Sequence, residues 1–145
     1  MADVHTPEQR HRNMAAIRGR NTAPELRVRQ LLYSMGYRYR LHRADLPGKP
    51  DIVLGRFRLA IFVNGCYWHC HDCRWGRVKP ATRAEFWASK RAETVRRDQR
   101  KREELEAMGW QVAVLWECET KKPELLQAQL ENILRNARSK SLKEQ

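Results

Sequence analysis

The spacing of apolar residues predicts a first helix over residues 23–35. Thr22 stands before this segment as an N-cap, Pro24 suits its first turn, and Gly36 follows where a left-handed residue closes a helix. Apolar side chains recur mostly along one stripe, which indicates a face packed on the core. That stripe comprises Leu26, Leu31, Leu32 and Met35.

Four shorter runs of apolar residues predict strands. Residues 37–41 alternate aromatic and basic side chains, while residues 51–54 and 58–63 read as a hairpin joined by a turn at residues 55–56. Residues 111–117 form the most apolar run and indicate a buried strand. We therefore expect a sheet built partly from a hairpin and partly from a strand that arrives much later in the chain.

Two further helices complete the pattern. A highly charged segment, residues 84–108, ends at Gly109, and residues 123–139 follow the last strand. This order of elements predicts an α/β fold with a mixed central β-sheet flanked by helices. The apolar face of the last helix comprises Leu125, Leu126, Leu130, Ile133 and Leu134.

The length of 145 residues fits one domain. Residues 1–20 are polar and basic with little apolar face, and we interpret them as an N-terminal arm. Residues 21–138 carry the predicted helices and strands. Residues 139–145 are polar and are predicted to be a disordered tail.

The charge balance favours a polyanionic partner. Lysine and arginine number 29 against 17 acidic residues, which gives a formal net charge of +12. Nucleic acid is the first candidate for such a chain. No apolar run approaches the roughly 20 residues needed to span a bilayer, and no signal-peptide pattern follows Met1, so we expect a cytoplasmic protein.

Cysteines and histidines are concentrated in one short segment. Residues 66–73 offer five soft or borderline ligands, and Cys118 follows at the end of the last predicted strand. Zinc in a structural site takes four such ligands, and thiols stay reduced in the cytoplasm. Counting does not decide which four bind, and buried cysteines also occur as small apolar residues. The candidates in the segment are Cys66, His69, Cys70, His71 and Cys73.

Three acidic residues are candidates for a nuclease centre, each with a simpler explanation. Asp51 opens a strand after Pro50, where a carboxylate can hold a hard cation or merely cap the turn. Glu25 lies three residues after Thr22, as in a capping box. Asp98 lies within a basic run, where local ion pairing on a helix surface is the ordinary explanation.

Aromatic residues lie among basic ones between residues 67 and 87. Flat apolar side chains beside cations suit insertion between base pairs, while phosphate contacts supply most of the binding. One of Phe86 and Trp87 is alternatively expected in the core, as are Trp110 and Trp116. The aromatic residues of the segment are Tyr67, Trp68, Trp75, Phe86 and Trp87.

An ordered set of motifs over nearly the whole chain resembles the very short patch repair endonucleases, the Vsr proteins. These motifs are Asn13-Met14, Thr22-Ala23 with Glu25, Leu46-Pro-Gly-Lys-Pro-Asp51, Ile61-Phe62, Gly65-Cys-Tyr-Trp-His69, Pro80-Ala-Thr-Arg83, Glu85-Phe-Trp87, Gly109-Trp110 and Trp116-Glu-Cys118. The resemblance implies a restriction-endonuclease-like, PD-(D/E)XK-like fold with a structural zinc site. It also implies Mg²⁺-dependent nicking of double-stranded DNA on the 5′ side of the thymine in a T:G mispair.

The same resemblance implies roles for individual residues of the nuclease centre. Asp51 matches a magnesium ligand, and the backbone carbonyl of Val63 completes the protein's share of the coordination. His69 matches the general base. Glu25 and Asp98 match acidic residues around the metal.

The resemblance further implies the zinc and DNA contacts. The zinc ligands fall on Cys66, His71, Cys73 and Cys118, which leaves Cys70 as a spare thiol. The residues implied at the DNA are Met14 of the arm, the wedge of Tyr67, Trp68 and Trp87, and Lys90 and Thr94 near the mispaired bases.

Three departures from the family pattern bear on activity and specificity. Asn64 stands where histidine is usual, Thr94 replaces an asparagine, and Val63 replaces a threonine. An amide at residue 64 can still bind water but cannot carry a proton near neutral pH, so the rate is expected to be lower.

The expected protein is thus a mismatch nuclease that acts as a monomer. Two alternative functions remain. One is a nuclease that accepts several mispairs or sequence contexts, as Asn64 and Thr94 suggest. The other is a non-catalytic, zinc-dependent DNA-binding module, which would need neither Asp51 nor His69.

Overall fold

A four-stranded mixed sheet forms the centre of the computed structural model, which describes residues 22–67, 69–74, 76–78 and 82–143. Its strands lie in the order β1 (Arg40–Leu41), β2 (Ile52–Leu54), β3 (Leu59–Asn64) and β4 (Gln111–Trp116). The neighbouring pairs β1–β2 and β2–β3 are antiparallel, whereas β3 and β4 are parallel. The mixed sheet predicted from the sequence is therefore confirmed.

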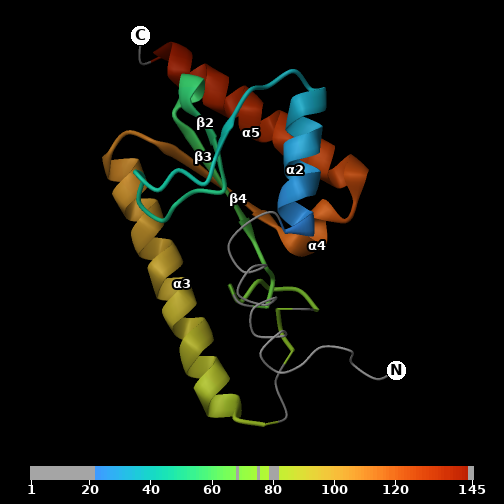
Figure 1. Cartoon of the computed structure of the whole chain (residues 1–145), viewed down its shortest axis with the longest axis vertical. Helices are drawn as coiled ribbons and strands as arrows, with labels where there is room; N and C mark the ends of the chain where they lie inside the picture. Colours follow the sequence, from blue (N-terminus) through green and yellow to red (C-terminus); the bar gives the residue numbers. More distant parts are fainter. Residues whose placement is uncertain (1–21, 68, 75, 79–81, 144–145) are drawn as a thin grey trace.

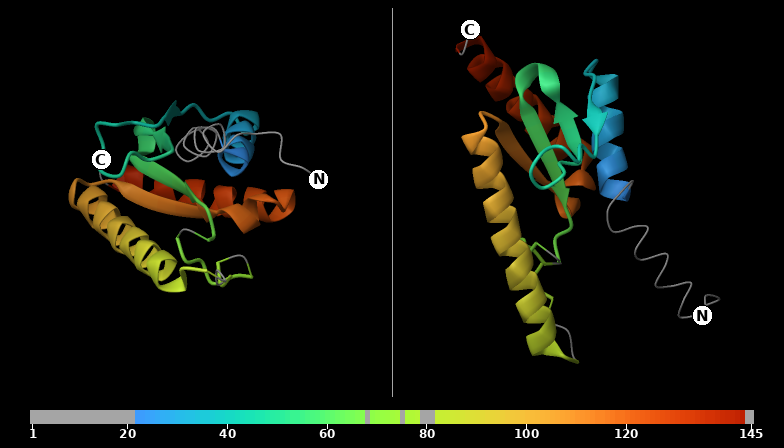
Figure 2. Two further views of the ribbon diagram at one scale, coloured as in Figure 1. Left: turned by 60° about the horizontal axis from the view of Figure 1, so that its bottom comes forward. Right: turned by 60° about the vertical axis from the view of Figure 1, so that its left-hand side comes forward.

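Helices cover both faces of this sheet. The helices α2 (Ala23–Ser34) and α5 (Pro123–Lys143) lie on one side, and α3 (Ala84–Ala107) runs along the other (Figures 1 and 2). The short helices η1 (Gly55–Phe57) and α4 (Glu117–Thr120) join neighbouring elements. None of the helices among the described residues is long and apolar enough to cross a membrane.

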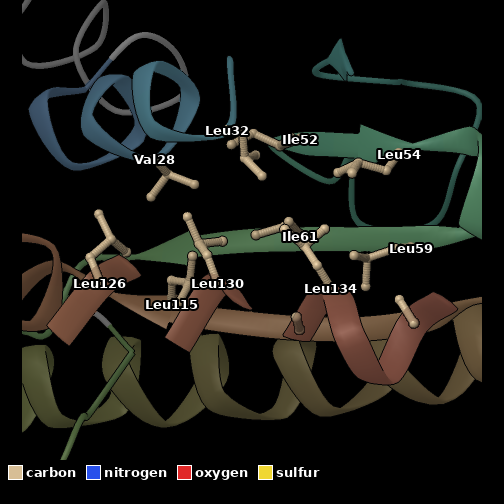
Figure 3. Close-up of a cluster of buried hydrophobic side chains, with 12 residues drawn as sticks. Val28, Leu32, Ile52, Leu54, Leu59, Ile61, Leu115, Leu126, Leu130 and Leu134 are labelled. Atoms are coloured by element: carbon tan, nitrogen blue, oxygen red, sulfur yellow. The ribbon is translucent and has the colours of Figure 1, made fainter. Parts of the chain in front are cut away.

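The main core lies between the sheet and the pair α2 and α5 (Figure 3). Alternate residues of the strands point into it because successive side chains of a strand face opposite ways. Burial of these branched side chains is the chief driving force for folding. The buried members are Val28, Leu32, Ile52, Leu54, Leu59, Ile61, Ala113, Leu115, Leu126, Leu130, Leu134 and Ala137.

The opposite face of the sheet has a much smaller core, beneath α3. It consists of Leu46, Val53, Ala60 and Leu105, with Phe62, Trp110 and Val112 packed against it. Leu105 is the one buried residue of α3 among those described, and it lies near the C-terminal end of the helix. The other described residues of α3 are exposed or only partly buried, and most of them are charged.

The ends of α2 and α3 agree with the predicted signals. The Thr22 side chain accepts the Glu25 amide at 3.4 Å, and Gly36 and Gly109 adopt the left-handed conformations expected after the two helices. Glycine suits both positions because it has no Cβ to clash there.

Four other predictions are corrected. The strand expected over residues 37–41 pairs only at Arg40–Leu41. Leu26 and Leu125 are exposed, while Val28 joins Leu32 in the core, since residues four apart share a helix face. One of Phe86 and Trp87 was expected in the core, but neither is buried. Helix α5 continues to Lys143 and so includes the first residues of the predicted disordered tail.

We predict that Leu105→Ala lowers the free energy of unfolding by about 2–5 kcal/mol, because it leaves a cavity where α3 meets the sheet. Val95→Ala in the same helix, where the side chain is 41% exposed, should change it by less than about 1 kcal/mol. Urea denaturation of the two variants measures both values. Equal losses would mean that Leu105 does not anchor α3.

Candidate functional site

The hairpin formed by β2 and β3 holds Asp51 in a partly buried position. Asp51 immediately precedes β2, and its Oδ2 accepts a hydrogen bond from the Val63 amide at 2.7 Å. Burial raises the pKa of the Asp51 carboxyl to about 6; the Val63 hydrogen bond opposes this rise and the nearby charge of Glu25 adds to it. Asp51 is thus more than the cap of a turn, because its side chain crosses to the neighbouring strand.

Glu25 reaches the same place from α2. Its side chain is only 3% exposed, with Oε1 2.7 Å from Nε2 of His42 and Oε2 3.3 Å from Nη1 of Arg29. Potential ligand atoms of Glu25, His42 and Asp51 all lie within 4.8 Å of one another. The backbone of Glu25 belongs to the helix cap, but its carboxylate belongs to this cluster.

His69 and Asp98 form a second part of the site. Nδ1 of His69 lies 2.5 Å from Oδ2 of Asp98, which comes from the middle of α3. The carboxylate therefore pairs with a residue of a distant loop and not only with its basic neighbours in the helix. A carboxylate on one ring nitrogen fixes the orientation of an imidazole and leaves the other nitrogen for proton transfer.

The end of β3 contributes a further residue to the site. Asn64 is buried, and with His69 and Asp98 it lines a hollow of about 290 Å³ between the sheet and α3. His69 also lies near enough to Asp51 to lower the pKa of that carboxyl, although burial outweighs this effect. The hairpin, the loop after it and α3 thus contribute to one centre.

The loop after β3 brings four soft ligands together with the end of β4. Ligand atoms of Cys66, His71, Cys73 and Cys118 lie within 4.8 Å of one another, and Cys118 Sγ is 3.5 Å from Nδ1 of His71. Tetrahedral zinc with ordinary bond lengths places its ligands roughly 3.3–3.8 Å apart, so three thiols and an imidazole in this arrangement fit the ion. Cys70 is exposed and lies outside this group.

Several contacts fix the shape of this loop. Gly76 is required because a Cβ there would lie 1.8 Å from the carbonyl oxygen of His71. The His71 ring stacks on Trp116 with centroids 4.2 Å apart, and the Cys118 amide donates to Cys66 Sγ at 3.4 Å. Burial raises the pKa of the Cys66 thiol to about 12, so in the absence of a cation this thiol keeps its proton.

One face of α3 presents side chains expected at the DNA. A hollow of about 590 Å³ is lined by Trp87, Lys90, Thr94 and His69, with Phe86, Glu93 and Arg97. The Thr94 hydroxyl donates to the Lys90 carbonyl at 3.1 Å, so it is engaged with its own helix. The predicted DNA contacts Met14 and Trp68, like the arm of residues 1–20, lie outside the described residues.

Arg91 joins this face of α3 to the loop. Its Nε donates to the Tyr67 carbonyl at 2.7 Å, its Nη2 donates to the Gly76 carbonyl, and its guanidinium lies over the Tyr67 ring. Tyr67 and His69 are thereby held beside α3. A cation on an aromatic face adds to the two hydrogen bonds.

Sequence reasoning missed His42 and Arg91. His42 directly follows the alternating segment of residues 37–41, and Arg91 is one of many basic residues in a helix, so neither has a local signal. Only the pairing of β1 with β2 and the approach of the loop to α3 give them their partners.

Comparison with known proteins gives consistent results. A sequence model of the family described as DNA mismatch endonuclease Vsr matches residues 2–75. The chain is 51% identical over 134 residues to the type II nicking enzyme V.XorIIP of Xanthomonas oryzae pv. oryzae, covering 92% of this chain and 98% of that protein. It is 47% identical over 118 residues to DNA mismatch endonuclease Vsr of Escherichia coli K12, covering 81% and 75%.

A solved structure shares the fold. The catalytic domain of the homing endonuclease I-Bth0305I aligns with a TM-score of 0.56 and 24% sequence identity, covering 81% of this chain and 98% of that one. At this level of identity the likeness concerns the arrangement of sheet and helices.

We predict that Asp51→Asn stabilises the protein above pH 6 when no magnesium is added. The carboxyl has a folded-state pKa of about 6 against an ordinary value of 3.8, so wild-type stability falls as pH rises through this interval. The amide should raise the free energy of unfolding by up to about 3 kcal/mol at pH 7.5 and by little at pH 4. Denaturant melts at the two pH values test this, and an equal effect at both would contradict it.

We predict that Cys118→Ser lowers bound zinc from about one ion per chain and lowers the melting temperature by about 5 °C or more, because one ligand of a closed site is lost. Cys70→Ser is the matched control and should change neither value, since Cys70 lies outside the cluster. Metal analysis and thermal melts measure both. Full zinc content in Cys118→Ser would exclude Cys118 as a ligand.

Proposed function

The chain belongs to the Vsr DNA mismatch endonuclease family, and from that membership we propose that it nicks double-stranded DNA 5′ of the thymine in T:G mispairs. It is a DNA endonuclease, which sets aside a non-catalytic DNA-binding module. The T:G substrate, the Mg²⁺ requirement, a restriction-endonuclease-like fold with structural zinc and action as a monomer are parts of this proposal.

One observation supports the proposal most strongly. A partly buried carboxylate, Asp51, and a carboxylate-bound imidazole, His69, come from separate elements and lie near enough to interact electrostatically. Nucleases that use a metal ion need a hard oxygen ligand beside a group that can accept a proton. The pair satisfies both needs.

Asp51 and the carbonyl of Val63 would hold Mg²⁺. Carboxylate and carbonyl oxygens are the ligands that this ion prefers, and Val63 already meets Asp51 through its amide. Bound Mg²⁺ supplies Lewis-acid polarisation of the scissile phosphate and stabilisation of the leaving oxygen.

His69 would act as the general base. Asp98 accepts the Nδ1 proton, so Nε2 is the atom that takes a proton from the attacking water. Asp98 also stabilises the imidazolium that forms. Asn64, buried on the wall of the same hollow, can orient water through its amide but cannot carry the proton itself.

The zinc ligands Cys66, His71, Cys73 and Cys118 would have a structural role. They connect the loop that carries Tyr67 and His69 to the end of β4, so the catalytic imidazole and an aromatic DNA contact share one support. Arg91 holds the same loop against α3, where Trp87, Lys90 and Thr94 face the second hollow.

Contacts to DNA would combine charge and aromatic insertion. Tyr67, Trp68 and Trp87 would enter beside the mispair, and Met14 of the N-terminal arm would approach from the other groove. Lys90 would contact the mispaired bases. The net charge of +12 supplies the attraction to phosphate that positions these groups.

A broader mispair range is a second candidate, favoured by one contact. Because the Thr94 hydroxyl donates to the Lys90 carbonyl, residue 94 turns its hydrogen-bonding group toward the helix backbone. A site with fewer hydrogen bonds to the bases discriminates less strongly between them. The same mispair panel distinguishes this candidate from strict T:G specificity.

We predict that labelled duplexes carrying every mispair in one sequence context are nicked fastest at T:G when Mg²⁺ is present. Asp51→Ala should reduce nicking at least about 10³-fold, and His69→Ala should reduce it about 10²–10⁴-fold, as for loss of a general base. Asp45→Ala removes a carboxylate that pairs with Arg43 and should leave the rate unchanged.

Single-turnover gels measure these rates. Wild-type nicking in the Asp51→Ala variant would contradict the metal assignment. Equal nicking of several mispairs would replace T:G specificity with the broader range.

A further inference from the structure

His42 forms hydrogen bonds with two of the three acidic residues of the nuclease centre, with the backbone of Asp51 and the side chain of Glu25. It follows β1, which lies beside α2 (Figure 2), and adopts a left-handed backbone conformation with φ of 48°. Its amide donates to the Asp51 carbonyl at 3.1 Å, and its Nε2 lies 2.7 Å from Oε1 of Glu25. A non-glycine residue in this conformation is uncommon and is kept where the surroundings determine it.

The side chains of Glu25, His42 and Asp51 form a compact cluster that is largely shielded from solvent. The side chains of Glu25 and His42 are 3% and 17% exposed, and the ligand atoms of Glu25, His42 and Asp51 lie within 4.8 Å of one another. A six-coordinate cation with bonds of about 2.0–2.3 Å places neighbouring ligands roughly 3 Å apart and opposite ligands roughly 4–4.6 Å apart. The spacing therefore accommodates one ion between the three groups.

The charges of the cluster also favour a cation. Two carboxylates lie within a few ångströms of each other in a space with little water, and a bound cation would offset the repulsion between them. Arg29 binds Oε2 of Glu25 and leaves Oε1 directed at His42. An ion at this position would meet one oxygen of each carboxylate and the imidazole nitrogen.

We propose that His42 is a further protein ligand of the metal held by Asp51 and the Val63 carbonyl, and that with Glu25 these residues form a mixed oxygen and nitrogen site. Imidazole suits divalent transition metals, whereas Mg²⁺ prefers oxygen ligands alone. The site therefore binds Mn²⁺ more tightly than Mg²⁺. This inference rests on the proposed metal role of Asp51 and adds a ligand and a metal preference to it.

A simpler role for His42 makes a different prediction. If the imidazole only donates a hydrogen bond to Glu25, a glutamine at position 42 can supply an amide donor in its place. If the imidazole binds the metal, glutamine removes the ring nitrogen, so no metal-bound nitrogen remains even where the amide oxygen takes its place. His42→Gln therefore distinguishes a positioning residue from a ligand.

The experiment measures Mn²⁺ binding to the zinc-loaded, DNA-free protein by calorimetry and pulsed electron paramagnetic resonance. Wild type should show ¹⁴N coupling from a directly bound imidazole. His42→Gln and His42→Ala should both lose that coupling, and His42→Ala should bind Mn²⁺ at least about 10-fold more weakly, while its Mg²⁺ binding changes less. His69→Ala and Arg43→Gln are matched controls and should keep the coupling.

The outcomes separate this inference from the proposed function. If Asp51→Ala abolishes Mn²⁺ binding but wild type shows no ¹⁴N coupling, or His42→Gln keeps it, then His42 is no ligand and only this inference fails. If wild type binds no Mn²⁺, or Asp51→Ala binds it as well as wild type, the metal role of Asp51 fails as well.

Discussion

The convergence of three loop side chains on Cys118 determines where the loop that carries His69 lies. Residues 65–78 contain no described helix or strand, and Cys66 is the one apolar or sulfur-bearing residue that the described part of this loop buries fully. A segment of this kind cannot fix its shape by hydrophobic burial. Its position follows from the cluster with Cys118 and from the hydrogen bonds of Arg91, and the position of His69 follows from that of the loop.

The other part of the site depends on the hairpin and its neighbours. The antiparallel pairing of β2 with β3 brings Asp51 to the Val63 amide, and the pairing of β1 with β2 brings His42 to Asp51. α2 packs on this sheet through Val28 and Leu32 and so carries Glu25 to the same place. Apolar packing thus gathers buried carboxylates that repel one another, and the site tolerates this cost where a cation can bind.

The parts of the fold that depend on residues close together in the sequence could be predicted. The parts that depend on contacts between distant segments could not. Thr22, Gly36 and Gly109 act within a few residues, so the ends of α2 and α3 follow from the sequence alone. The spacing of apolar residues misplaced Leu26 because one helix allows several stripes, and packing on α5 selects the one with Val28. Residues 37–41 have the alternation of a strand, but only two of them find a partner strand.

The residues of the site also differ in whether local signals or long-range contacts identify them. Counting ligands left the zinc set open, and the structure brings together the four residues that the family resemblance implied. Asp98 looked like a member of a local ion-pair network until the loop placed His69 beside it. His42 had no local signal because its contacts are with Glu25, 17 positions before it, and with Asp51, which immediately precedes β2. α3 is anchored to the sheet at Leu105, so substitutions at exposed residues of the second hollow, such as Lys90, are expected to change stability little, and selection can alter that surface without loss of the fold.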